Sequence, residues 1–331
     1  MTYELSCGLP PGPEFADLAE LAETLGYRRI WIFGSEVLWE DPFLHLALAA
    51  RRTSHIGLAT AVTIVGDRSE MSMASSIATL ARLSEGRFRP CFGTGYTARM
   101  AMGRRPSTVP QMIDEVATVR SLLRGETVSI DGAAARMLHV PGMGAQRPVD
   151  AEIWLSVFGP VGVRRAAEVA DGIIGPPHPT LPSATMVSGT VLDPGEARDS
   201  ERVRRAIGPW AVLAWHNAYA HGGAAAVDAM PGGREWREQL EALEPEGRRH
   251  LLTFEGHVSH LMERDEHLLD HLGLDGGDSP VRARSSMIGE ADEVASRLTG
   301  LAAAGFREII YTPSGPDVAR ELRAFAAAGP R

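Results

Sequence analysis

Glycine and hydroxyl-bearing residues occur at the ends of two apolar, strand-like runs in this chain of 331 residues. The first run extends from His55 to Val65, and the second begins at Gly86. The small and hydroxyl-bearing residues concerned, with one valine among them, are Thr60, Ala61, Val62, Thr63, Gly93, Thr94 and Gly95. Because glycine has no side chain, a ligand can approach its backbone closely. Such surroundings suit a broad, flat, apolar cofactor with a polar tail.

Another glycine motif follows the apolar run at 152–157. Its residues are Phe158, Gly159, Pro160 and Val161, and a helix is predicted to begin among them. Free backbone N–H groups at the start of a helix bind phosphate, so this motif is a candidate site for the polar tail. An ordinary tight turn between a strand and a helix would have the same residues.

Three side chains near predicted strand ends are candidates for contact with a substrate or cofactor. Glu36 could serve as a general acid if burial raised its pKa, and otherwise it is a solvated loop residue. Trp39 could flank the cofactor or the substrate, or it could pack beneath its own loop. Arg99 could hold a carboxylate or a phosphate through two hydrogen bonds, or it could form a surface ion pair.

Four histidines lie between residues 257 and 271. His257 and His260 are three residues apart, and His267 and His271 are four apart. Metal ligands on a helix can have these spacings, but no cysteine or catalytic glutamate accompanies them in a known pattern, so we predict no metal site. His257 is instead a candidate acid or base on the substrate side, because histidine titrates near neutral pH.

The predicted substrate pocket includes residues that follow several predicted strands: Ser35, Trp39, Tyr96, Arg99, His178 and His216. The sequence lacks the Gly-x-Ser-x-Gly turn before a helix that serine hydrolases use. It also lacks a Walker loop. The predicted strand ends do not carry the histidine and aspartate clusters of a metal-dependent hydrolase. These absences leave a glycine-rich cofactor site as the main chemical feature.

The order of the predicted elements indicates how these residues come together. An apolar strand, an alanine-rich helix and a second apolar strand between His55 and Gly95 form a βαβ unit. Strands this apolar are buried on both faces, so we expect a parallel sheet covered by helices. Eight strands are predicted, at 3–8, 29–33, 55–65, 86–95, 152–157, 171–175, 210–215 and 306–312.

Eight strands in this alternation predict an α/β fold, a closed (β/α)8 TIM barrel with its site at the carboxyl ends of the strands. We expect one domain over residues 1–331, with insertions at about 124–150 and 176–207 and a helical excursion at about 218–275. The alternative is an open doubly wound sheet. That fold has a glycine fingerprint after its first strand, and the segment from Cys7 to Pro13 has the wrong spacing.

Composition limits the class of protein. Apolar residues make up 44% of the chain, which is enough for a full core. The net charge of −9 gives no electrostatic footprint for nucleic acid or an anionic membrane. No apolar run is long enough to span a membrane, and the N-terminus lacks the apolar region of a signal peptide, so we expect a cytoplasmic protein. Cys7 and Cys91 are predicted to be reduced core residues.

Several phrases carry a family resemblance over nearly the whole chain, most weakly in 176–207 and 220–250. They lie at 18–27, 39–43, 74–88, 93–95, 103–106, 156–160, 170–172 and 288–290. With these phrases in this order, the chain resembles the luciferase-like flavin/deazaflavin oxidoreductase superfamily. Within it, the chain is most similar to the branch that uses coenzyme F420.

The resemblance implies a (β/α)8 barrel that binds FMN or F420 non-covalently at the carboxyl ends of its strands. It also implies a non-proline cis peptide, here between Ala61 and Val62, and a phosphate site at Phe158 to Val161. Relatives are often homodimers, and a separate reductase supplying reduced cofactor is expected as a partner.

Some residues depart from the family pattern. Many F420-dependent members have Asp-His where this chain has Gly34 and Ser35, and some have a carboxylate where it has Tyr96. Their usual His-Pro is Glu70 and Met71 here. Because the familiar proton-handling residues are missing, the departures argue against sugar-dehydrogenase and methanopterin-reductase reactions.

We therefore predict an F420-dependent oxidoreductase that transfers a hydride between the deazaflavin C5 and a small organic substrate. Glu36 and His257 are its candidate catalytic residues. One alternative is an FMN-dependent luciferase-like monooxygenase, and another is a flavin-binding protein without turnover. No motif identifies the substrate, because its pocket would be built from the least recognisable segments.

Overall fold

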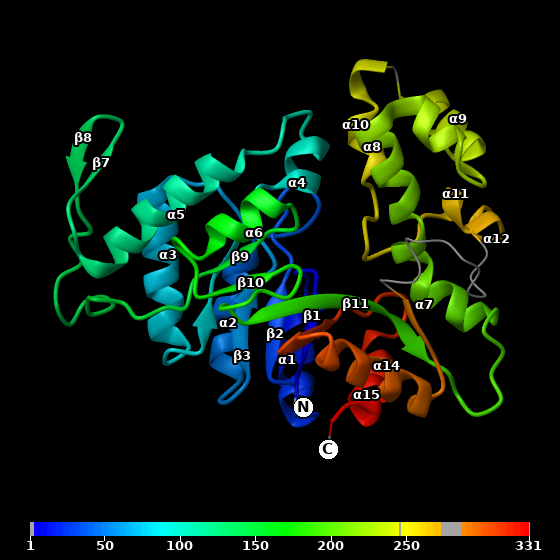
Figure 1. Ribbon diagram of the computed structural model, residues 1–331, viewed down its shortest axis with the longest axis horizontal. Coiled ribbons are helices and arrows are strands. Elements are labelled where there is room, and N and C mark those ends of the chain that lie inside the picture. The colour runs from blue at the N-terminus through cyan, green and yellow to red at the C-terminus, as the bar shows by residue number, and fades with distance from the viewer. Residues whose placement is uncertain (1–2, 245, 273–285, 331) are drawn as a thin grey trace.

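The computed structural model describes residues 3–330, apart from 245 and 273–285. At its centre is a sheet of parallel strands with helices around it (Figure 1). The strands of this sheet are β1 (Glu4–Leu9), β2 (Arg29–Ile32), β3 (Gly57–Thr60), β4 (Thr63–Ile64), β5 (Phe88–Arg89), β6 (Cys91–Gly93), β9 (Trp154–Ser156), β10 (Gly172–Ile174), β11 (Ser183–Val191) and β13 (Glu308–Tyr311), with β12 (Ser286–Gly289) paired to the end of β11.

The sheet closes on itself between its third and fourth strands. β3 and β4 are pieces of one strand separated by Ala61 and Val62, and β5 and β6 are pieces of the next strand separated by Pro90. β3 pairs with β5, and β4 pairs with β6. These pieces also form the two ends of the strand order. Eight strands therefore make a closed barrel, which confirms the predicted fold.

Helices that follow the strands cover the outside of the barrel (Figure 1). They are α1 (Phe15–Thr24), α2 (Pro42–Arg52), α3 (Glu70–Leu83), α5 (Val109–Arg124), α6 (Pro160–Ala166), α14 (Ala291–Ala303) and α15 (Val318–Ala328). α1 buries Phe15 and Ala19 on one face and is followed by Gly26, whose φ of +82° favours glycine. α2 begins at Pro42, where Asp41 accepts a capping hydrogen bond.

Apolar side chains form one core between the barrel and its helices and another inside the barrel. Along β2, Ile30 and Ile32 belong to the outer core and Trp31 to the inner one, because side chains alternate along a strand. The inner cluster is Trp31, Ala59, Cys91, Trp154, Ile174, Ala184 and Ile310. Cys7 and Cys91 are both free and buried, as predicted. No helix in the described part of the chain is long and apolar enough to cross a membrane.

The seventh strand lies elsewhere than the sequence predicts. Residues 210–215, predicted as a strand, lie in α7 (Glu201–Ala211) and α8 (Leu213–Asp228). The seventh strand is β11, which falls within the insertion predicted at 176–207. A short apolar run such as 210–215 has no periodicity that separates a buried helix from a strand. Because β11 contains several small and hydroxyl-bearing residues, its sequence does not indicate a strand.

Helices between β11 and β12 form a helical excursion beside the barrel (Figure 1, right). They are α7, α8, α9 (Gly233–Leu243), α10 (His250–Thr253), α11 (Glu263–Glu266), α12 (Leu269–Leu272) and the short 3-10 helix η1 (Glu246–Arg248). The excursion has its own apolar core, which includes Trp215 and Trp236. It begins at 201 rather than 218, and its predicted last residues, 273–275, lie outside the described residues.

The insertion predicted at 124–150 contains an antiparallel hairpin of β7 (Val128–Ile130) and β8 (Ala133–Ala135). This hairpin projects away from the barrel on the side opposite the excursion (Figure 1). It contributes no residue to the lining of the cavity described below.

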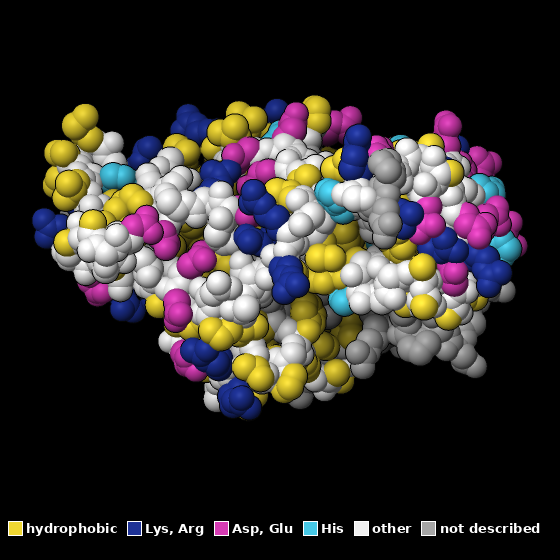
Figure 2. All heavy atoms as spheres, turned by 90° about the horizontal axis from the view of Figure 1, so that it is seen from above, with side chains coloured by type: hydrophobic (Ala, Val, Ile, Leu, Met, Phe, Trp, Pro, Cys, Tyr) yellow, Lys and Arg dark blue, Asp and Glu magenta, His cyan; other side chains and the backbone are white. Residues whose placement is uncertain are grey.

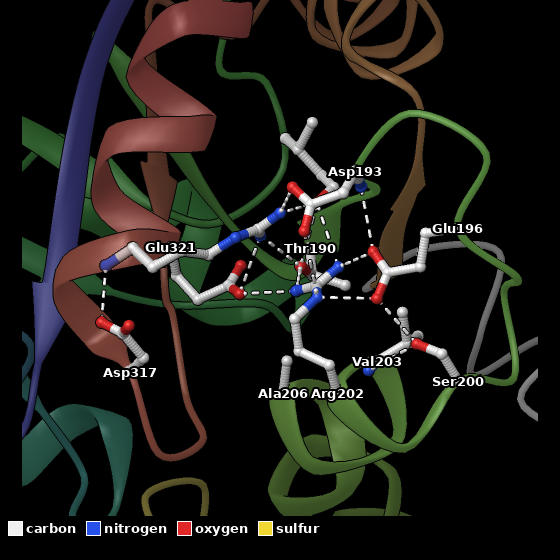
Figure 3. A network of polar contacts seen from close by, with 12 residues as sticks. Thr190, Asp193, Glu196, Ser200, Arg202, Val203, Ala206, Asp317 and Glu321 are labelled. Atoms are coloured by element: carbon white, nitrogen blue, oxygen red, sulfur yellow. Dashed lines mark hydrogen bonds and ion pairs between the residues drawn. The ribbon is translucent and has the colours of Figure 1, made fainter.

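Ion pairs attach the start of the excursion to the barrel (Figure 3). Arg202 on α7 donates hydrogen bonds to Glu321 Oε1 at 2.9 Å and to Thr190 Oγ1 at 2.8 Å, and it also pairs with Glu196. Arg320 on α15 donates to the same Glu321 oxygen at 2.9 Å. Because such bonds are charge-assisted, this network holds α7 against β11 and α15.

Candidate active site

A cavity of about 310 Å³ opens at the carboxyl ends of the barrel strands, where the sites of (β/α)8 barrels lie. One wall follows the barrel strands, and the other belongs to the excursion. Figure 2, seen from above, shows hydrophobic side chains gathered in the middle of this face with histidines beside them. The cavity is lined by Phe33, Gly34, Ser35, Trp39, Ala61, Val62, Ile64, Gly93, Thr94, Gly95, Tyr96, Thr97, Ala98, Ser156, Phe158, Met186, Trp210, Leu213, His257 and Val258.

Gly34 and Gly93 pack against Val62 in the barrel-side wall, and Gly95 lies in the same wall beside Ile64. A β-carbon on Gly34 would lie 2.3 Å from the Val62 carbonyl oxygen, and one on Gly93 would lie 2.5 Å from Val62 Cγ2. Gly95 has a φ of +71°, in the left-handed region that favours glycine. The peptide bond between Ala61 and Val62 is cis, as the family resemblance implies. Backbone, rather than side chains, therefore makes much of this wall.

The opposite wall is made by Trp210 of α7, Leu213 of α8, and His257 and Val258 of the loop before α11. Sequence reasoning identified only His257 among these, because it assigned 210–215 to a strand. Val258 has a φ of 50°, which is rare for a β-branched residue. Such strained backbone persists only where the surrounding structure holds it, and it is concentrated at functional sites.

Two side-chain contacts join the walls. Trp39, after β2, donates from Nε1 to Ser259 Oγ at 3.1 Å. Tyr96, the first residue of α4 (Tyr96–Ala101), has its hydroxyl oxygen 2.8 Å from His221 Nδ1, and the two rings stack with centroids 4.5 Å apart. Ser259 and His221 both belong to the excursion, so these contacts hold it over the cavity.

His257 presents one ring nitrogen to the cavity. Its ring centroid lies 5.6 Å from Phe254, 5.9 Å from His216 and 6.4 Å from Trp39. Among the described residues, its Nδ1 is buried without a hydrogen-bond partner. Because His257 lines the cavity, we assign Nε2 to the side of the ring that faces it. Burial lowers the pKa of His257 to about 4, so the imidazole is neutral at pH 7.

The His216 ring packs against the His257 ring and does not line the cavity. It was predicted to follow a strand, but it lies on α8 and is buried. Burial lowers its pKa well below the usual value of 6.5. Its role is therefore to pack against the His257 ring.

Some of the predicted site residues line the cavity, and others do not. Those that line it are Ser35, Trp39, Ala61, Val62, Gly93, Thr94, Gly95, Tyr96, Phe158 and His257. Those that lie outside its lining are Glu36, Thr60, Thr63, Arg99, Gly159, Pro160, Val161, His178 and His216. Thr60 is buried, and its hydroxyl donates to the Cys91 carbonyl at 3.1 Å. His178 Nδ1 accepts hydrogen bonds from the N–H groups of Thr180 and Leu181.

The predicted phosphate motif lies at the edge of the cavity. Phe158 is 72% exposed and lines the cavity, whereas the next three residues do not. α6 begins at Pro160 with Gly159 as its N-terminal cap, so the predicted helix start is confirmed. Binding of phosphate by this motif stays a prediction.

Charged side chains are gathered in a second cavity of about 370 Å³ beside α4. Its lining includes Glu36, Asp67, Arg68 and Arg104. The Glu36 carboxylate lies 3.6 Å from Arg68, and Arg99 pairs with Asp67 at 3.2 Å. The described lining of the first cavity contains no Asp, Glu, Lys or Arg. Among the residues that the structure describes, no three potential ligands are grouped to hold a metal ion.

The chain is similar to known proteins in sequence and in fold. A family model described as luciferase-like monooxygenase matches residues 3–308. A curated relative, the 5,10-methylenetetrahydromethanopterin reductase of Methanolobus tindarius, is 32% identical over 179 residues. That alignment covers 51% of this chain and 52% of the relative, so it spans about half of each protein.

Solved structures share the fold over almost their full length. The coenzyme F420 dependent tetrahydromethanopterin reductase of Methanopyrus kandleri has a TM-score of 0.68 at 16% identity, with 98% of each chain covered. An F420-dependent secondary alcohol dehydrogenase has a TM-score of 0.66 at 14% identity, covering 99% of this chain and 98% of the other. The oxygenating constituent of 3,6-diketocamphane monooxygenase from Pseudomonas putida, in complex with FMN, has a TM-score of 0.63 at 14% identity, covering 99% and 96%.

Proposed function

Because the chain belongs to the luciferase-like monooxygenase family, we propose that it is an oxidoreductase that binds coenzyme F420 in the cavity at the barrel mouth. When bound, this cofactor supplies hydride chemistry at C5 of its deazaflavin ring. The protein's own residues would hold the ring, orient a small organic substrate against it and exclude water.

The observation that best supports this proposal is the glycine-bordered wall. Gly34 and Gly93 allow the chain to pack closely against Val62, because a β-carbon on either glycine would clash with that residue. A flat ring system fits against a wall made of backbone and small side chains. We propose that this wall, with Thr94 and Gly95 beside it, holds the ring.

The polar tail of the cofactor would extend past Phe158 toward the start of α6. Pro160 has no backbone N–H, so Gly159 and Val161 would supply the donors to a phosphate. This placement keeps the charged tail at the edge of the cavity, away from its uncharged interior.

The excursion side would bind the substrate. His257 lies on that side, with the Trp39 ring of the barrel next to it, and we assign its Nε2 to the cavity. We propose that this nitrogen contacts the substrate and handles its proton. Glu36, the other predicted catalytic residue, lies beside Arg68 at the second cavity and has no part in this proposal.

The curated relative favours hydride transfer over oxygenation, because it is named as a reductase. The second candidate function is FMN-dependent monooxygenation. The description of the matching family model and the FMN-bound structural neighbour favour that alternative. Both reactions would use the same cavity. For either reaction we propose that a separate reductase supplies the reduced cofactor. We also propose that the protein is a homodimer, which sedimentation velocity would test.

Cofactor retention tests whether the protein is an F420-dependent oxidoreductase or an FMN-dependent monooxygenase. Purified protein is incubated with F420 or with FMN and passed over a gel-filtration column, and the cofactor in the protein peak is measured by absorbance. We expect F420 to be retained and FMN to be lost. Retention of FMN alone would favour the monooxygenase, and loss of both cofactors would exclude both functions. Retained F420 without oxidation or reduction across a panel of alcohols and ketones would indicate a cofactor-binding protein without turnover.

A further inference from the structure

We propose that the part of the substrate inside the cavity is uncharged and carries a carbonyl or hydroxyl oxygen that accepts a hydrogen bond from His257. This substrate class rests on the proposed function, because it takes the cavity as the place of reaction. It is argued from the charge of the lining, the state of the His257 ring and the partners of the other polar side chains.

The lining excludes charged groups. Its described residues include no Asp, Glu, Lys or Arg, and the aromatic and aliphatic side chains Trp210, Leu213 and Met186 face the same space. A charge that enters such surroundings loses its water and gains no opposite charge, so its burial is unfavourable. The charged residues nearby line the second cavity instead. An anionic or cationic group in the first cavity would therefore be bound weakly.

His257 is a hydrogen-bond donor in this space. The rings of Trp39, Phe254 and His216 surround its imidazole, and its Nδ1 is buried without a partner. A buried nitrogen without a partner is tolerated more readily as a lone pair than as an N–H group. We therefore assign the proton of the neutral ring to Nε2. A carbonyl or hydroxyl oxygen is the natural acceptor for that N–H group.

Two other polar rings of the lining are already engaged, and the Trp210 indole N–H, which has no partner among the described residues, is buried. The Trp39 indole N–H donates to Ser259, and the Tyr96 hydroxyl lies against His221 Nδ1. His257 is thus the large polar ring in the lining that offers an open nitrogen to a ligand. It lies in the same loop as Val258, whose strained backbone indicates that the surrounding structure holds this loop in place.

Three matched probes test the charge preference: acetophenone, the anion para-acetylbenzoate and the cation para-(aminomethyl)acetophenone. Their dissociation constants are measured by calorimetry on the full-length protein, both with F420 loaded and without it. We expect acetophenone to bind at least about tenfold more tightly than either charged probe. Equal or tighter binding of a charged probe, or no binding of acetophenone, would overturn the inference.

Two variants test the donor. His257→Phe keeps the ring stacking and removes the N–H group, and we expect it to weaken acetophenone binding at least about fivefold. His257→Gln keeps an N–H donor, and we expect it to bind acetophenone within about twofold of the wild type. Unchanged binding in His257→Phe would also overturn the inference. Retention of F420 is measured on the same samples, so a failure of the proposed function is seen separately from a failure of the substrate class.

Discussion

Trp39 Nε1 donates a hydrogen bond of 3.1 Å to Ser259 Oγ across the mouth of the cavity. The two residues are 220 positions apart in the chain, one after a barrel strand and the other in the excursion. This bond and the Tyr96–His221 contact are side-chain links between the two walls. The fit of the cavity to a ligand therefore depends on how firmly the excursion is held.

The first prediction concerns that link. Ser259→Ala removes the acceptor of the Trp39 indole, and it should lower the free energy of unfolding by about 1 kcal/mol. It should also speed dissociation of bound F420 severalfold, because the outer wall opens more readily. Urea unfolding and stopped-flow fluorescence measure the two effects. Ser259→Thr keeps the hydroxyl group and serves as the control. A dissociation rate equal to that of the wild type would show that this bond does not hold the wall.

The second prediction concerns the glycine wall. In Gly93→Ala the new β-carbon would lie 2.5 Å from Val62 Cγ2, so the side chain of Val62, which lines the cavity, must shift. We expect the affinity for F420, measured by fluorescence titration, to fall at least about tenfold. Gly12→Ala is the matched control, because a β-carbon there meets nothing within 4 Å.

The double variant Gly93→Ala, Val62→Ala removes the side-chain atom that clashes, and part of the lost affinity should return. If Gly93→Ala bound the cofactor as tightly as the wild type, the ring would have to lie elsewhere.

The third prediction concerns acid stability. Burial lowers the pKa of His257 from 6.5 to about 4, so the unfolded chain takes up a proton before the folded protein does. The contribution of His257 to the free energy of unfolding is therefore fully present above pH 6.5. It decreases between pH 6.5 and 4, by up to about 1.4 kcal/mol per pH unit. His216 beside it contributes with the same sign. His257→Asn should make the free energy of unfolding fall less steeply with decreasing pH. Urea unfolding at a series of pH values measures this slope. His55→Asn, at an exposed site, should leave the slope unchanged. An NMR titration that placed the pKa of His257 at 6.5 would contradict the prediction.

The fourth prediction concerns Asp265, whose contribution to stability changes with pH in the direction opposite to that of His257. Burial raises the pKa of Asp265 from 3.8 to about 6, so the folded protein holds this proton more tightly than the unfolded chain. Stability from this group is present below pH 3.8 and is lost as the pH rises through 6. Asp265→Asn should thus raise the free energy of unfolding at pH 7 by up to about 3 kcal/mol. Asp17→Asn, on the exposed side of α1, is the control. A lower stability of Asp265→Asn at pH 7 would refute this account of the buried carboxyl group.

The fifth prediction concerns the amino end of the barrel. Buried Glu308 accepts hydrogen bonds from Trp31 Nε1 at 2.8 Å and from Arg89 at 3.1 Å, and it lies 3.6 Å from Arg29. Glu308→Gln would leave the buried Arg29 without its counter-charge and should lower the free energy of unfolding by about 3–5 kcal/mol. Glu4→Gln breaks an exposed ion pair and should cost less than about 1 kcal/mol. Chemical denaturation compares the two, and equal losses would argue against a special role for the buried pair.

The sequence by itself determined most of the barrel and the barrel-side wall of the cavity. The apolar run at 55–65 and the glycines at 93 and 95 are local signals, because a strand buried on both faces needs continuous apolar residues and a close backbone approach needs glycine. The same reasoning located Ala61 and Val62, which do line the cavity.

Only the tertiary structure decided what faces that wall. The apolar residues at 210–215 carry no periodicity that separates strand from helix, and they are helical as part of the excursion, where Val212 and Trp215 belong to its apolar core. Whether His216 or His257 reaches the cavity depends on how α8 and the loop before α11 pack together, and that is set by contacts between residues far apart in the chain. The absence of charge from the described lining, with Glu36 and Arg68 in the neighbouring cavity, has the same origin. Side-chain direction follows from packing, which a local pattern of residues does not encode.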